Sequence, residues 1–122
     1  MSLPAFAEVL KGVAGRVPES ELLMVIGTDG IPIEKLTLRA DPNMEAVAAE
    51  HTTLLRASLA AAADTGLGAL QELAITTERL TTLLVAITPD YFLFASLAPG
   101  AVMGRARFAL RLAALALERE FE

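Results

Sequence analysis

The feature that most constrains the fold is a pair of short apolar runs separated by a tight turn. Residues 83–87 are too few for an independent helix, and residues 91–95 are rich in aromatic and aliphatic side chains. Pro89 and Asp90 supply the turn between them. Both runs are apolar at successive positions, so both faces of the two strands are expected to be covered. The sequence therefore predicts a β-hairpin in the middle of a sheet.

A second hairpin is predicted upstream. Residues 22–26 form another buried apolar run, and the turn at residues 27–30 joins it to a strand over residues 31–38. Pro32 cannot donate to a β-ladder, which confines that strand to one edge of the sheet. Its apolar alternation slips across residues 34–35, which predicts a bulge or a strong twist there.

Amphipathic periodicity predicts helices over residues 3–17, 44–63 and 101–121. Asn43 is expected to cap the second of these helices. Residues 70–77 are predicted to form the last strand, at the second edge of the sheet. Every link between consecutive strands is short, which forces antiparallel pairing.

The predicted fold class is α+β: a five-stranded antiparallel sheet with helices on both faces, in the order α-β-β-α-β-β-β-α. We expect residues 1–122 to form one domain, because a chain of 122 residues can bury a core without disulfides or a structural metal.

Composition excludes several classes of function. The chain has no cysteine, and none of its apolar runs approaches the roughly 18 residues that a membrane span needs. Its net charge is -5, whereas a phosphate-backbone footprint needs clustered Lys and Arg. We therefore expect a cytoplasmic protein that binds no nucleic acid and does not insert into membranes.

Titratable groups are too sparse to predict catalysis or a cofactor. His51 is the only histidine, lies on the apolar face of the predicted helix, and has no second strong zinc ligand beside it. We expect it to be structural. Asp29 and Glu34 are explained by a turn and an edge strand. The glycines at residues 27–30 lack the following helix and the lysine of a phosphate-binding loop.

Three features of the sequence carry a family resemblance: Met24-Val25-Ile26-Gly27-Thr28-Asp29-Gly30-Ile31-Pro32, the long Ala-rich helix, and residues 91–107 with the Leu97-Ala98-Pro99-Gly100-Ala101-Val102-Met103-Gly104 segment. In these features the chain resembles the roadblock/dynein light chain domain family. Its bacterial members include the MglB type of GTPase regulator. The resemblance implies a roadblock/profilin-like fold and a homodimeric, non-enzymatic adaptor or regulator of a small Ras-like GTPase.

Members of the family commonly dimerise by joining sheets edge to edge and packing their central helices. In this chain the strand at residues 70–77 has neither Pro nor Lys to prevent edge pairing. The dimer interface is therefore expected to contain Leu70, Glu72, Leu73, Ala74, Ile75, His51 and Leu55.

Partner binding is expected on the outer face of the central helix, at Thr52, Thr53 and Arg56. Arg107 forms a basic cluster with Arg105 and Arg111. This cluster either contacts the GTPase, or forms a solvated helix face or salt bridges with neighbouring acids. One alternative function is a small-ligand sensor that holds an effector between the sheet and a helix. A third is an unrelated hydrolase, for which the sequence indicates no catalytic residues.

Overall fold

The computed structural model describes residues 3–122 and confirms the predicted order of elements. The helices and strands are α1 (Leu3–Arg16), β1 (Ser20–Gly27), β2 (Pro32–Thr37), α2 (Asn43–Asp64), β3 (Glu72–Thr76), β4 (Thr81–Thr88), β5 (Tyr91–Leu97) and α3 (Met103–Glu118), followed by the 3₁₀ turn η1 (Arg119–Phe121).

The strands form one antiparallel sheet in the order β2-β1-β5-β4-β3. The predicted central hairpin is confirmed, because β5 is the middle strand and β4 lies beside it. Both edge assignments are also confirmed, with β2 at one edge and β3 at the other. The sheet therefore leaves β3 with a partner on one side only.

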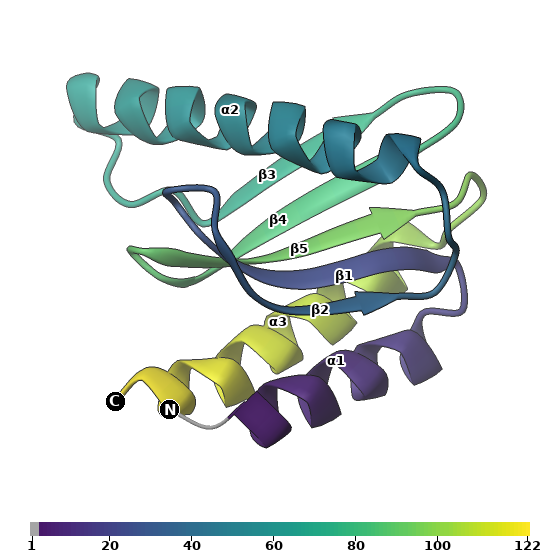
Figure 1. The fold of residues 1–122 in the computed structure, drawn as a ribbon. Coiled ribbons are helices and arrows are strands. Elements are labelled where there is room, and N and C mark those ends of the chain that lie inside the picture. Colours follow the sequence, from purple (N-terminus) through teal and green to yellow (C-terminus); the bar gives the residue numbers. More distant parts are fainter. Residues whose placement is uncertain (1–2) are drawn as a thin grey trace.

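The helices cover the sheet from two sides (Figure 1). On one side α1 and α3 lie next to each other, and their apolar residues pack on Leu23, Val25, Leu83 and Leu93. On the other side α2 lies alone across the sheet, over a cluster that includes Met24, Leu84, Phe92 and Phe94. The molecule thus has a two-helix face and a one-helix face.

The predicted bulge is present but misplaced. Val25 pairs with Glu34 and Ile26 pairs with Pro32, which leaves Ile33 as the extra residue. The preceding turn sets this register, because Gly27 N–H donates to the carbonyl of Ile31 at 3.0 Å. The irregularity therefore directly follows Pro32 instead of crossing residues 34–35.

The predicted cap of α2 is wrong. The helix begins at Asn43, whose side chain makes no capping bond; instead Asp41 Oδ1 accepts the N–H of Asn43 at 2.9 Å. Pro42 has helical dihedral angles, with φ of -57° and ψ of -28°. Because Pro42 already adopts this conformation, Asn43 falls in the first turn and Asp41 supplies the acceptor.

Candidate interaction surfaces

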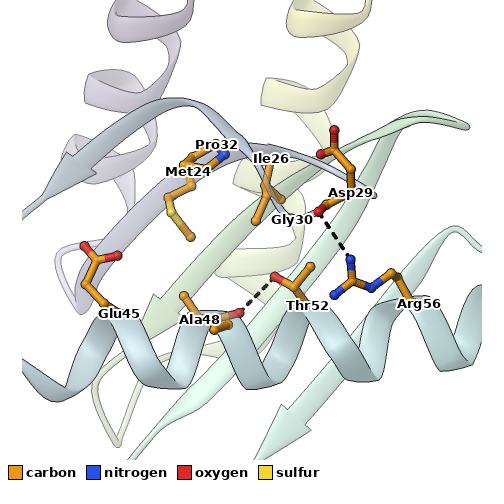
Figure 2. A pocket seen from close by; sticks show the side chains of 10 residues that line it. Met24, Ile26, Asp29, Gly30, Pro32, Glu45, Ala48, Thr52 and Arg56 are labelled. Atoms are coloured by element: carbon orange, nitrogen blue, oxygen red, sulfur yellow. Dashed lines mark hydrogen bonds between the residues drawn. The ribbon is translucent and has the colours of Figure 1, made fainter.

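The buried face of α2 agrees in part with the apolar face expected from the sequence, which includes Met44, Ala48, Leu54 and Leu55. Met44, Ala48, Thr52 and Leu55 are buried, whereas Leu54 is 47% exposed. Thr52 donates its hydroxyl to the carbonyl of Ala48 at 2.9 Å, which satisfies its polar group inside the core (Figure 2). The expectation that Thr52 faces outward is therefore wrong, and Leu54 faces solvent instead of the sheet.

The free edge of β3 can be assigned residue by residue. Ala86 N–H donates to the carbonyl of Gln71, and Thr77 N–H donates to the carbonyl of Leu80, at 2.9 Å in each case. In an antiparallel ladder the residues that bond to a given neighbour alternate along the strand. The backbone groups of Glu72, Ala74 and Thr76 therefore point away from β4, toward the open edge.

The side chains of the candidate dimer strand divide between the two faces of the sheet. Leu70 and Leu73 pack in part against the cluster under α2. Ile75 is half-buried and Ala74 is exposed. The open backbone edge is thus bordered by partly buried apolar side chains, a composition suited to strand pairing.

Glu72 is held by α3. Its carboxylate accepts the Nε–H of Arg107 at 3.2 and 3.3 Å, and Arg111 Nη2 lies 3.6 Å from its Oε1. For Arg107 and Arg111 the structure thus shows pairing with a neighbouring acid, whereas Arg105 has no ion-pair partner among residues 3–122. Arg107 lies on the two-helix side of the molecule, away from the outer face of α2.

The two candidate interface residues on α2 are not equally accessible. Leu55 is fully buried against the sheet, so it cannot contact a second chain unless α2 moves. His51 is half-buried, with its ring centroid 6.5 Å from that of Phe94. Its Nδ1 is buried and has no hydrogen-bond partner within residues 3–122. Burial lowers the pKa of His51 below its ordinary value of 6.5.

The variant His51→Gln is expected to change stability modestly and to weaken its dependence on pH. The folded-state pKa of His51 is lowered, so below 6.5 the unfolded chain binds a proton more readily. Stability from the neutral ring is therefore present above that pH and decreases below it. Urea unfolding at about pH 7 and about pH 5.5 tests this. If the free energy of unfolding changes equally between the two pH values in the wild type and in His51→Gln, the assignment is contradicted. It is also contradicted if equilibrium dialysis finds one zinc ion bound per wild-type chain and none bound to the variant.

Thr53 and Arg56 lie on the exposed side of α2, as predicted. Arg56 Nη1 donates to the carbonyl of Asp29 at 3.2 Å, which ties the helix to the β1–β2 turn (Figure 2). Thr53 donates its hydroxyl to Ala49 at 3.3 Å. No side chain within residues 3–122 forms an ion pair with Arg56. Its charge therefore remains available to a partner.

A cavity of about 290 Å³ lies between α2 and the first hairpin (Figure 2). Its floor includes Met24 and Ile26, and Arg56 and Glu45 lie at its rim. Glu45 is paired with Lys35 at 2.7 Å. The volume is at the lower end of the range for ligand pockets, about 300–1,000 Å³. The cavity thus offers a small ligand little space and few free polar groups.

Metal clusters and membrane-spanning helices are both absent from the described part of the chain. Residues 3–122 contain no cluster of three or more His, Cys, Asp or Glu side chains suited to a metal ion. No helix in the same range combines the length and the apolar composition that a bilayer-spanning segment requires.

Comparison with known proteins identifies the family. The sequence model of the Roadblock/LC7 domain matches residues 7–96, which is more than half of the chain. The chain therefore belongs to the Roadblock/LC7 domain family, and this membership confirms the resemblance and supports a regulatory adaptor role. No curated protein sequence matches the chain.

Solved structures share the fold. MglC from Myxococcus xanthus is 28% identical, with a TM-score of 0.73 over 95% of this chain and 98% of that chain. The gliding protein MglB from Thermus thermophilus is 18% identical, with a TM-score of 0.84 over 96% and 88%. A Roadblock/LC7 domain from Streptomyces avermitilis is 15% identical, with a TM-score of 0.80 over 93% and 95%. The last two similarities show the fold alone.

Proposed function

We propose that this chain is a non-enzymatic, cytoplasmic homodimer that binds a small Ras-like GTPase as an adaptor or regulator. The observation that carries the proposal is the open edge of β3 beside α2, whose outer face is solvent-exposed. Membership of the Roadblock/LC7 family supports the regulatory role. The choice of partner rests on the MglB type of GTPase regulator, which is among the bacterial members of this family.

The dimer is argued from backbone chemistry. Unpaired donors and acceptors at Glu72, Ala74 and Thr76 form a template for a second strand. Two β3 strands that pair around a two-fold axis give a continuous sheet across both chains. The neighbouring surface of α2 carries exposed small residues such as Ala57, Ala60 and Ala61, over which a second helix backbone can approach closely.

The GTPase is assigned to the outer face of α2. Arg56 presents an exposed guanidinium at the margin of that face, next to the β1–β2 turn. This group binds carboxylates bidentately and is enriched at protein interfaces. Thr53 lies beside it on the same exposed side. A surface built from two α2 helices exists only in the dimer, so binding is expected to depend on dimerisation.

Calorimetry against a Ras-like GTPase from the same organism tests this assignment. We expect tighter binding to the GTPase loaded with a non-hydrolysable GTP analogue than with GDP. Arg56→Glu is expected to weaken the tighter complex at least about tenfold, equivalent to about 1.4 kcal/mol, without dissociating the dimer. Equal affinity for the two nucleotide states, or unchanged affinity in the variant, would refute the proposal.

The matched control is Lys11→Glu, a charge reversal on α1. The side chain of Lys11 is 64% exposed and lies on the side of the sheet opposite α2. It is expected to leave GTPase binding unchanged. Arg107→Glu is a weaker test of GTPase binding. It removes the hydrogen bonds from Arg107 to Glu72 on β3, so it can weaken the dimer and reduce GTPase binding indirectly. The light-scattering mass of each variant separates these effects.

A further inference from the structure

On the face opposite α2, helices α1 and α3 lie side by side (Figure 1). A groove runs between them. Small residues line it: Gly12 on α1, and Ala109, Ala113 and Ala116 on α3. The hollow has a volume of about 260 Å³. A Cβ added at Gly12 would meet no atom within 4 Å, so the space above that residue is open. We call this hollow the α1–α3 groove.

Large apolar side chains follow the groove on α3. Phe108 and Leu115 are each 61% exposed, and Leu112 is 40% exposed. Spacings of four and three residues place them in one stripe along the helix. A contiguous exposed apolar stripe next to a groove indicates an interaction site, whereas single exposed apolar residues do not.

The occupant of the groove must satisfy its own backbone hydrogen bonds. Both walls are helices, whose backbone groups are bonded internally, so the groove offers no edge to an added strand. A helix carries its own bonds, and small residues in the groove allow its close approach. This geometry favours a third helix with one apolar face.

Basic residues at one end of the groove indicate which charge the bound helix carries. Arg16 and Arg105 line a hollow of about 360 Å³ that continues the groove past Ala109 and Phe108. Neither arginine has an ion-pair partner among residues 3–122. Two unpaired guanidinium groups beside an apolar stripe are complementary to carboxylates.

A second copy of the same face is a poor occupant. The charged residues that line the groove and the hollow that continues it are Arg16 and Arg105, both of them basic, whereas Glu118 stands at the far end of α3. Self-association through this face would bring arginines of the two copies together, and like charges at an interface oppose binding.

We propose that the α1–α3 groove binds an acidic amphipathic helix of a partner protein. The apolar residues of that helix pack on Phe108 and Leu112, and its carboxylates pair with Arg16 and Arg105. Helices α1 and α3, which form the walls of the groove, lie on the opposite side of the sheet from α2 (Figure 1). The proposal is therefore independent of the GTPase and of the β3 dimer.

The test uses a fluorescent designed helix of about 16 residues, similar in length to α3, with leucines at helical spacing and glutamates elsewhere. Micromolar binding is expected, with amide shifts in NMR spectra at Gly12 and Ala113. Phe108→Asp, and separately Arg16→Glu with Arg105→Glu, are each expected to weaken binding at least about tenfold. Leu67→Asp alters an apolar residue that is 80% exposed outside the groove and is expected to change nothing.

Specific outcomes would overturn the proposal. One is equal binding of a peptide with lysines in place of the glutamates, and another is full affinity in Phe108→Asp. Absence of binding at about 100 μM, well above the expected dissociation constant, is a third. A lower light-scattering mass for Phe108→Asp would assign the face to a second copy. Cosedimentation of the wild type, but not of Phe108→Asp, with phosphatidylserine vesicles would assign it to a membrane.

Discussion

Phe94→Ala is expected to lower the free energy of unfolding by about 3–5 kcal/mol, the usual range for truncation of a buried aromatic side chain. Phe94 lies on the middle strand, is fully buried, and faces the cluster under α2. Its removal leaves a cavity that α2 alone would have to fill. Urea denaturation of the variant and the wild type measures the difference.

The matched control is Phe108→Ala, the same truncation at a position that is 61% exposed. Its effect on stability is expected to be within about 0.5 kcal/mol, the typical range for surface substitutions. Similar losses in the two variants would contradict the placement of Phe94 in the core.

Ala74→Pro is expected to dissociate the proposed dimer while the chain remains folded. The N–H of Ala74 points away from β4, so proline removes a donor from the open edge and none from the β3–β4 ladder. A symmetric dimer loses this bond twice. At about 1 kcal/mol for each bond, the dissociation constant should rise at least about 30-fold.

Light scattering over a concentration series measures this change, and Ile75→Pro supplies the contrast. The backbone of Ile75 bonds to β4, so proline there is expected to reduce stability, unlike Ala74→Pro. A wild-type chain that is monomeric at tens of micromolar, where a micromolar dimer would be populated, would refute the dimer itself.

The arrangement of the sheet was predictable because its signals are local. Residues 83–87 and 91–95 are apolar at successive positions, which is typical of strands covered on both faces. Pro32 alone assigns its strand to an edge, since it cannot donate to a ladder. These features depend on a few neighbouring residues, and the structure confirms both.

The details of α2 depended on contacts that the sequence does not encode locally. Leu54 and Leu55 are adjacent leucines, and only packing against the sheet decides which one is buried. Thr52 is polar in the sequence, yet its hydroxyl is satisfied within the helix. For Arg107, the partner Glu72 lies 35 residues away, so only the tertiary fold shows the pair.

The most direct test of the proposed function is the mass of the complex formed with a Ras-like GTPase, measured by light scattering during gel filtration. Bound to a non-hydrolysable GTP analogue, the GTPase should elute with two copies of this chain. The same complex should be absent with GDP and with Ala74→Pro. A GTPase bound to a single copy, a complex that ignores the nucleotide, or no complex at all would contradict a dimeric, nucleotide-sensitive regulator.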